Sequence, residues 1–265
     1  MQKLTGILLI LLVCLQAGAQ QAPCTRRYLV AVNNYAPHFY RDGLNRPMGL
    51  THELVEILQR RMGCIFIEKD VSRPVAIEQM KTGRLDLAFL VIKHPDLERS
   101  ADFESLYTTR RELLVQKSSY SSGKTISDFL NDRKIMYGSF IGSRTALSQS
   151  EESELFKHHR ILESTDLSSL YELFKKKRVQ AIMMSPLMNE FHAKRLQMED
   201  QVVRLVDDKS SVEIGIYYSK RRISRSERRL IREALEVLKQ DGTLLKILKD
   251  YMPKESQPLI AVKGS

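Results

Sequence analysis

The chain has 265 residues, of which 43% are hydrophobic and 28% are charged. This balance can build a packed core, so a wholly disordered chain is excluded. The 12 Gly, 8 Pro and 3 Cys also exclude a collagen-like protein and a small disulfide-dense scaffold. The length is enough for one large domain or two of ordinary size.

The first 19 residues have the pattern of an export signal. Lys3 supplies a positive charge, Leu4 to Leu15 is almost unbroken apolar sequence, and Ala17-Gly18-Ala19 is a small-residue cleavage site. The apolar run is shorter than the roughly 20 residues that a membrane-spanning helix needs. We therefore expect cleavage after Ala19 and a periplasmic protein. An uncleaved membrane anchor is the alternative.

The formal net charge is +10, from 42 Lys plus Arg against 32 Asp plus Glu. In a cytoplasmic protein this excess would favour nucleic acid as a partner. An exported protein meets little nucleic acid, so we expect no such partner. The basic clusters Lys175–Arg178 and Lys220–Arg222 are expected to be solvated surfaces, or surfaces that attract anionic ligands, envelope polymers or a membrane.

Hydrophobic periodicity predicts an alternation of strands and helices from Tyr28 onward. Strands are expected at 28–32, 65–67 and 85–90, with helices at 50–62 and 75–81. This alternation is typical of an α/β fold with a mostly parallel sheet. A strand at 113–116 leads into a polar stretch, 118–123, which is the best candidate for a domain boundary.

A second α/β unit follows that boundary. Expected elements are a helix at 128–130, a strand at 135–137, a helix opened by Gly142-Ser143, a helix at 167–177, strands at 179–184 and 212–219, and helices at 226–240 and 244–251. The tail after Pro253 is expected to be mobile.

Five short stretches of the sequence match, in the same order and with similar side-chain chemistry, the motifs of one known family. Tyr35–Phe39 resembles a Tyr-Pro-Pro-Phe loop, Gly49–Leu54 resembles Gly-Phe-Asp-x-Asp-Leu, Lys81–Asp86 resembles Ser-Gly-Lys-x-Asp, Asp102–Tyr107 resembles Asp-Phe-Ser-x-x-Tyr, and Lys239–Thr243 contains an Asp-Gly-Thr turn. Together they resemble the extracellular solute-binding proteins of family 3, which are amino-acid-binding-like and have the type 2 periplasmic binding protein fold.

The resemblance implies two α/β lobes, each a mostly parallel sheet flanked by helices. Lobe one would comprise 28–116 plus 212–251, lobe two 117–211, and a C-terminal tail 252–265. The lobes would be joined by two hinge strands, at 113–116 and 212–215, and would close on a small ligand by a hinge motion. The implied function is capture of a solute for ABC transport by a monomer, with an inner-membrane permease as partner.

The resemblance also places the ligand residues. Tyr35, Phe39 and Tyr107 stand where the family presents aromatic walls, although ordinary loop packing would also explain them. Ser143 and Arg144 follow a glycine before a predicted helix, where exposed amide groups and the helix dipole favour an anion. A plain helix N-cap is the alternative for Ser143.

Two charged anchors of the family are missing. Leu97 stands where the family has an arginine for the carboxylate of an amino acid, and Ser185 stands where it has an aspartate for the ammonium group. A zwitterion would bury both charges unpaired. We therefore expect a ligand with one anionic end and an apolar or flat body, and no tight binding of the common amino acids, unless Arg99 replaces the missing arginine.

Cys24 and Cys64 each precede an expected strand of lobe one, at Tyr28 and Ile65. The first two strands of this fold are parallel neighbours, so the leading ends of these strands are close together. We expect a disulfide that closes a loop of about 40 residues and stabilises the fold by roughly 3 to 4 kcal/mol.

Other catalytic or cofactor chemistry is not indicated. His52-Glu53 lacks the second histidine of a zinc helix, and the adjacent His158 and His159 diverge on a helix. We expect no metal, no cofactor and no enzyme activity. Two alternatives stay open, which are an exported sensory or interaction module with a degenerate cleft and a cyclohexadienyl dehydratase-like enzyme. Glu190 and Arg144 would be available to that enzyme.

Overall fold

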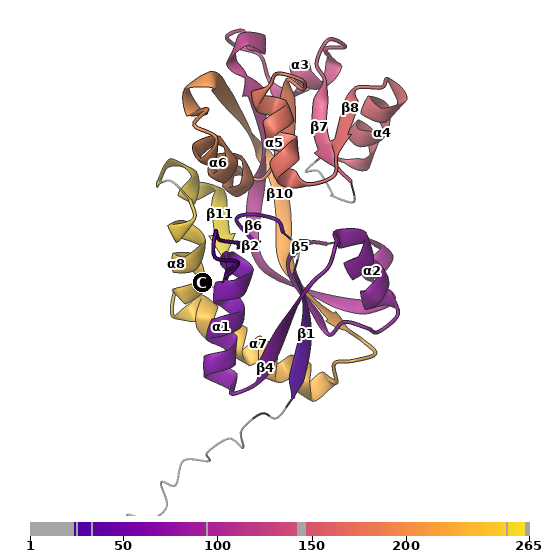
Figure 1. Ribbon diagram of the computed structural model, residues 1–265, viewed down its shortest axis with the longest axis vertical. Coiled ribbons are helices and arrows are strands. Elements are labelled where there is room, and N and C mark those ends of the chain that lie inside the picture. The colour runs from indigo at the N-terminus through magenta and orange to yellow at the C-terminus, as the bar shows by residue number, and fades with distance from the viewer. Residues whose placement is uncertain are drawn as a thin grey trace, which may run out of the picture.

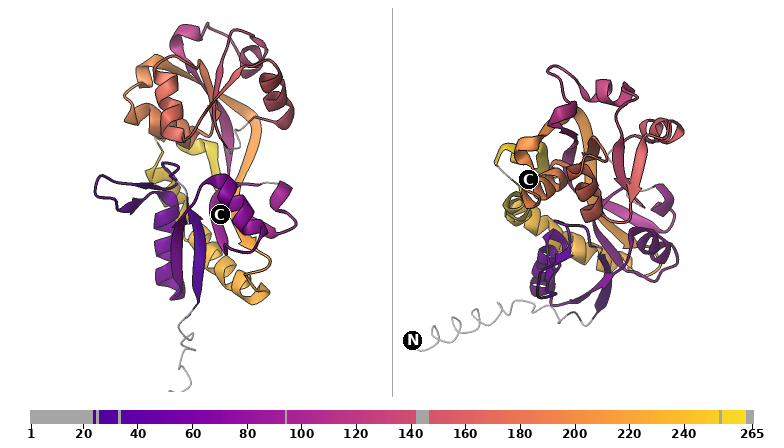
Figure 2. Two further views of the ribbon diagram at one scale, coloured as in Figure 1. Left: turned by 45° about the vertical axis from the view of Figure 1, so that its right-hand side comes forward. Right: turned by 45° about the horizontal axis from the view of Figure 1, so that its top comes forward.

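The computed structural model describes residues 24, 26–32, 34–93, 95–141, 147–252 and 254–262. Two lobes lie one above the other, and two long strands, β6 (Ala101–Gln116) and β10 (Val202–Ser219), run through both of them (Figure 1). The lobes stay distinct in both views of Figure 2. The predicted two-lobed α/β fold is confirmed.

Lobe one is built on the parallel strands β4, β1 and β5. Its elements are β1 (Arg27–Val32), β2 (Tyr40–Arg41), β3 (Pro47–Met48), α1 (Leu50–Met62), β4 (Ile65–Asp70), α2 (Arg73–Lys81), β5 (Leu87–Ile92), α7 (Arg225–Gln240) and α8 (Thr243–Asp250). β1 pairs with β4 on one side and β5 on the other. One face of α1, with Leu54 and Leu58 fully buried, packs with α7 and α8 on the same core.

Lobe two repeats this plan. Its elements are α3 (Ile126–Asn131), β7 (Tyr137–Phe140), α4 (Gln149–Lys157), β8 (Ile161–Ser164), α5 (Leu167–Lys175), β9 (Ala181–Met184) and α6 (Pro186–Arg195). Short 3₁₀ turns lie at Lys117–Ser119 and Glu199–Gln201 in this lobe, and at Pro95–Leu97 in lobe one. The parallel strands β9, β7 and β8 form its sheet, and α5 buries Leu170 and Phe174 against it.

One continuous sheet connects the lobes, in the order β4-β1-β5-β10-β6-β9-β7-β8. β10 pairs with β5 in lobe one, and β6 pairs with β9 through residues 112–115 in lobe two. Residues 113–116, expected as a hinge strand, are thus paired inside the lobe-two sheet. The β6–β10 pairing shifts register between Asp207 and Val212, opposite Thr109 to Arg111. This irregular stretch lies between the two lobe sheets.

The expected mobile tail after Pro253 is wrong for residues 254–262. They form a 3₁₀ helix, η4 (Lys254–Leu259), and a strand, β11 (Ile260–Val262). β11 pairs antiparallel with β6, with Ile260 opposite Thr109 and Val262 opposite Tyr107. Val262 is buried, because the alternation of this short strand turns it into the lobe-one core.

The helix expected to begin at Gly142-Ser143 begins at Gln149 instead. Ser148 is its N-cap, and a reciprocal capping box joins Ser148 to Glu151. A capping box satisfies two amide groups at the start of a helix, which fixes the boundary there. Gly142 lies outside the described residues.

The predicted disulfide between Cys24 and Cys64 is confirmed. It joins the segments that precede β1 and β4, which pair in parallel from Arg27 and Ile65 onward. In the described part of the chain, no helix is both long and apolar enough to cross a membrane.

Candidate functional site

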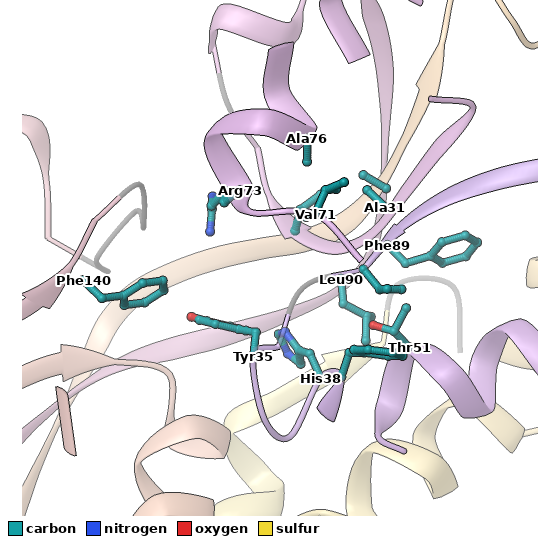
Figure 3. Close-up of a pocket in the computed structure, with 14 residues that line it drawn as sticks. Ala31, Tyr35, His38, Thr51, Val71, Arg73, Ala76, Phe89, Leu90 and Phe140 are labelled. Carbon is teal, nitrogen blue, oxygen red and sulfur yellow. The ribbon is translucent and has the colours of Figure 1, made fainter. Parts of the chain in front are cut away.

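A cleft between the lobes contains two adjoining cavities, of about 80 Å³ and about 30 Å³. The larger is lined mainly by lobe one, with Phe140 at the end of β7 contributing from lobe two (Figure 3). The smaller reaches the two connecting strands and the start of α6. Four residues line both cavities, namely Tyr35, His38, Arg73 and Leu90. The cleft lies at the carboxyl ends of β1, β5, β7 and β9, where α/β sheets commonly bind ligands.

The loop after β1 is fixed on the N-terminus of α1. The carbonyls of Pro37 and His38 accept hydrogen bonds from the amides of Leu50 and Thr51, at 3.0 and 2.7 Å. Gly49 permits this contact, because its φ is +105° and a Cβ there would lie 2.6 Å from the Pro37 carbonyl oxygen. The Gly49 motif thus holds the side chains of this loop in the cleft.

The three predicted aromatic residues lie in different environments. Tyr35 is half-buried, lines both cavities and directs its hydroxyl toward Phe140 across the cleft, with the ring centres 5.4 Å apart (Figure 3). Phe39 also lines the larger cavity, but it is almost fully buried in the lobe-one core. Tyr107 is buried in that core and lines neither cavity.

The polar residues predicted in lobe two are placed in part. Ser185 lines the smaller cavity and is the N-cap of α6, where its Oγ accepts from the Met188 amide at 3.5 Å. Its hydroxyl proton can still be donated to a ligand. Ser143 and Arg144 lie outside the described residues.

Neither Leu97 nor Arg99 takes part in the cleft. Leu97 is buried among Met80 and Tyr217 beneath α2. Arg99 is exposed and lines neither cavity.

The charged residues of the cleft are Arg73 and Arg110, which the sequence did not indicate. Arg73 begins α2 and lines both cavities, while Arg110 lies on β6 and lines the smaller one. The approach of Arg73 depends on a long-range contact, since the Val71 amide donates to the Val32 carbonyl at 2.9 Å and holds the start of α2 beside the end of β1. A Ser-Arg-Pro sequence at a helix start gave no signal of this position.

The cleft is cationic. Among the described residues that line the two cavities, none is an aspartate or a glutamate. Burial lowers the pKa of His38 to about 3, with the Arg73 charge adding to the effect, so this imidazole is neutral. Burial also raises the pKa of Tyr35 to about 12. The Arg110 guanidinium also donates to the Ser210 carbonyl. Its remaining N–H groups, the Arg73 guanidinium, a neutral imidazole and a phenol hydroxyl can therefore donate hydrogen bonds to an anion.

His38 has a further feature that bears on ligand binding. Its side chain is 9% exposed, and its Nε2 has no hydrogen-bond partner within the described structure. A buried polar atom without a partner is costly, which is consistent with an atom that a ligand satisfies.

A buried polar chain in lobe two reaches the loop of lobe one. The Nε2 of His192 donates to the Ala36 carbonyl at 3.1 Å, and the His192 ring stacks on Tyr171 at 4.2 Å. The Tyr171 hydroxyl donates to the Asn189 side chain at 2.7 Å, which in turn donates to Glu112 at 3.0 Å. Burial lowers the pKa of His192 to about 4, with the Arg195 charge adding to the effect. This chain is a polar contact between the lobes.

The comparisons with known proteins agree on the family. The model of the bacterial extracellular solute-binding proteins, family 3, matches residues 28–254. The chain belongs to this family. The comparison with curated proteins finds no match.

Three solved structures share the fold at low sequence identity. AbpA, an amino acid ABC transporter substrate-binding protein from Streptococcus pneumoniae bound to L-arginine, is 20% identical, with a TM-score of 0.70 and coverage of 85% of this chain and 94% of that chain. AncCDT-1, an ancestral amino acid-binding protein and precursor of cyclohexadienyl dehydratase, is 18% identical, with a TM-score of 0.70 and coverage of 86% and 96%.

The third is a histidine kinase sensor domain with similarity to periplasmic binding proteins. It is 14% identical, with a TM-score of 0.70 and coverage of 86% of this chain and 96% of that chain. A transporter component, an enzyme precursor and a sensor thus resemble this chain equally well. The fold alone does not distinguish these functions, so the function must be argued from the cleft.

Proposed function

We propose that this protein is an exported, periplasmic solute-binding protein that captures a small anionic solute between its lobes. The main support for this proposal is the positive charge of the cleft. Arg73 and Arg110 line its cavities, and none of the described lining residues is a carboxylate. A site of this charge favours a carboxylate or phosphate group and disfavours an ammonium group.

The proposed site combines structural and sequence-based assignments. Arg73 binds the anionic group, and Tyr35 and Phe140 enclose an apolar or flat body from the two lobes. Ser185 donates a hydroxyl from lobe two. Ser143 and Arg144 stay candidates on sequence grounds, because they lie shortly after Phe140, the last residue of β7, in the sequence.

Delivery follows capture in this proposal. The export signal, with cleavage after Ala19, places the protein in the periplasm, where it acts as a monomer and passes the solute to an inner-membrane permease. The family membership supports a role in binding.

The test is calorimetry on the chain from Gln20, with the twenty common amino acids and panels of monocarboxylates, dicarboxylates, sugar phosphates and amines. We expect binding only among the anions and no consumption of the bound compound. Arg73→Met should weaken that binding about 10- to 100-fold, the range for one charge-assisted contact. Arg99→Met changes the charge equally at an exposed lobe-one site and should leave the affinity unchanged.

Three outcomes would contradict the proposal. Sub-micromolar binding of a common amino acid would show that an anchor for the ammonium group had been overlooked. Turnover of a bound compound would favour the dehydratase-like enzyme. If Arg99→Met lost affinity and Arg73→Met kept it, the anionic group would be bound by Arg99, which lies outside the cleft in the structure.

A further inference from the structure

Two basic segments that are distant in the sequence meet at one end of lobe two. Arg133-Lys134 precedes β7, and Lys176-Lys177-Arg178 precedes β9; all five side chains are exposed. β7 and β9 pair in parallel from Tyr137 and Ala181, so the segments before them lie at the same sheet edge. This is the end that carries α3, far from lobe one in Figure 1. We call these five residues the basic face.

Two polar side chains, of Gln180 and Arg160, fix the backbone beneath the basic face. The Gln180 amide donates to the Met136 carbonyl at 2.9 Å, and the Met136 amide donates to the Gln180 side chain at 3.1 Å. Arg160 is 6% exposed and donates to the carbonyls of Phe129 and Ile135 at 3.0 and 3.1 Å. The two loops are therefore tied to each other, and the charges they carry are held together.

The basic face has few acidic neighbours. Within the described structure, none of its five side chains forms an ion pair. The nearby Asp132 is paired with Lys124 at 3.3 Å, and it also attracts Lys134 electrostatically. Glu199 and Asp200 are the acidic residues of the adjacent 3₁₀ turn. Five positive charges thus project from one end of the lobe with little local neutralisation.

The cations of lobe one are arranged differently. Asp86 is paired with both Arg26 and Arg222, and Asp102 is paired with both Lys220 and Arg228. Carboxylates are interleaved with these cations, so the attraction of that surface for an anion is reduced.

Stabilisation of helix ends explains the basic face only in part. Lys176 is the C-cap of α5, where its positive charge interacts favourably with the helix dipole. Arg133 and Lys134 lie beyond Asp132, the C-cap of α3, and thus outside the last turn of that helix. A second observation points to lipid. Phe156, in the last turn of α4, is 45% exposed, and the strand that follows this helix, β8, starts at the same end of the sheet as β7. Cations at the same end of a domain as an exposed aromatic ring are typical of surfaces that contact membranes.

We propose that the basic face of lobe two holds the protein against an anionic lipid surface. Lysine and arginine side chains near such a surface contribute attraction that is additive and decreases with salt. Phe156 would enter the headgroup region beside them. The cleft is at the other end of this lobe, so a bound membrane would leave it accessible. The inference does not depend on the identity of the solute.

The experiment measures co-sedimentation of the chain from Gln20 with vesicles at low ionic strength. One set of vesicles is phosphatidylcholine containing one-third phosphatidylglycerol, and the other is phosphatidylcholine alone. We expect binding to the anionic set only. The triple variant Lys176→Gln, Lys177→Gln and Arg178→Gln should lose on the order of 100-fold in affinity, from about fivefold per charge.

A matched triple variant controls for net charge. Arg84→Gln, Arg99→Gln and Arg225→Gln remove three exposed cations from lobe one and should lower the affinity less than about tenfold. Equal losses in the two triple variants would overturn the proposal, as would failure of the unaltered protein to bind anionic vesicles. Thermal unfolding of each variant establishes that it is folded.

Phe156→Ser separates a lipid surface from a soluble polyanion. Weaker vesicle binding with unchanged binding of soluble polyphosphate supports the membrane. If Phe156→Ser binds vesicles as well as the unaltered protein does, and polyphosphate is bound more tightly than vesicles, the proposal would be overturned in favour of a polyanionic polymer.

Discussion

His38 and His192 are buried histidines whose ionisation affects the stability of the fold. Both are almost fully buried, and burial lowers the pKa of His38 to about 3 and of His192 to about 4. Each is therefore neutral in the folded protein at a pH where an exposed histidine is partly charged. His192 also donates across the lobes to Ala36, so its environment links the ionisation of one residue to the contact between lobes.

The free energy of unfolding should fall as the pH is lowered from about 6.5 to about 4. The unfolded chain takes up protons at the ordinary histidine pKa near 6.5, whereas the folded protein does not until near pH 4 or below. At pH 5 each histidine should cost on the order of 2 kcal/mol relative to pH 7. Denaturant titrations at the two pH values measure this difference.

Two variants separate the buried histidine from an exposed one. His192→Gln removes the titrating group and keeps an amide donor. The free energy of unfolding that this variant loses between pH 7 and pH 5 should therefore be smaller than in the unaltered protein, by on the order of 2 kcal/mol. His159→Gln replaces an exposed histidine instead and is the matched control, which should not reproduce this change. An identical pH dependence in His192→Gln and the unaltered protein would contradict the assignment.

At the scale of elements, β11 pairs with a stretch of β6 that no other described strand covers on that side. β6 pairs with β9 through residues 112–115 and with β11 through 107–109, so these two strands follow one another along the same side of β6. η4 precedes β11 and contacts α6 of lobe two. The C-terminal segment therefore belongs to the region between the lobes, and it covers a stretch of strand edge that would otherwise be open to aberrant pairing.

Val262→Asp should detach β11 from β6. Burial of a carboxylate among apolar side chains costs several kcal/mol, which a three-residue strand cannot offset. Hydrogen exchange of the β6 amides near Tyr107 and Thr109 should accelerate by about tenfold or more, as expected for a loss of about 1.4 kcal/mol of local stability. Ala261→Asp places the same charge on the exposed face, so equal acceleration there would contradict the prediction.

At the scale of the whole molecule, two strands join the lobes and side-chain contacts hold them together. Tyr35 meets Phe140, Tyr40 meets Phe191 with ring centres 5.7 Å apart, and His192 contacts the Ala36 carbonyl. The register shift between Asp207 and Val212 interrupts the regular pairing of β6 and β10 between the lobe sheets. An interrupted ladder bends more easily than a continuous one, so we expect this stretch to act as the hinge.

A solute identified by calorimetry should make the molecule more compact in small-angle scattering. Phe140→Ser removes the aromatic contact on Tyr35 and should weaken solute affinity about two- to tenfold, since an aromatic pair contributes about 0.5 to 1.5 kcal/mol beyond its buried area. Leu162→Ser, at an exposed position of β8, is the control and should bind and close normally. An unchanged radius of gyration at saturation would exclude closure by a hinge motion.

The sequence was sufficient to predict the order of most elements and the disulfide. Tyr28 to Val32 and the strand around Leu87 are buried on both faces, and such apolar runs are visible without a structure. β6 and β10 were recognised only at their apolar ends. Their remaining residues are half-buried and carry charges such as Arg110 and Asp207, which conceal a strand from any local pattern.

Only the tertiary structure decided which residues the cleft brings together. Local periodicity reports burial within one element, whereas Arg73 approaches Tyr35 and His38 because a backbone contact holds the start of α2 beside the end of β1. The basic segments before β7 and β9 meet for a similar reason, since parallel pairing places their distant positions at one sheet edge. The sequence determined the family, the lobes and the disulfide. The charge of the cleft and the basic face depend on contacts between residues far apart in the chain, which no single segment encodes.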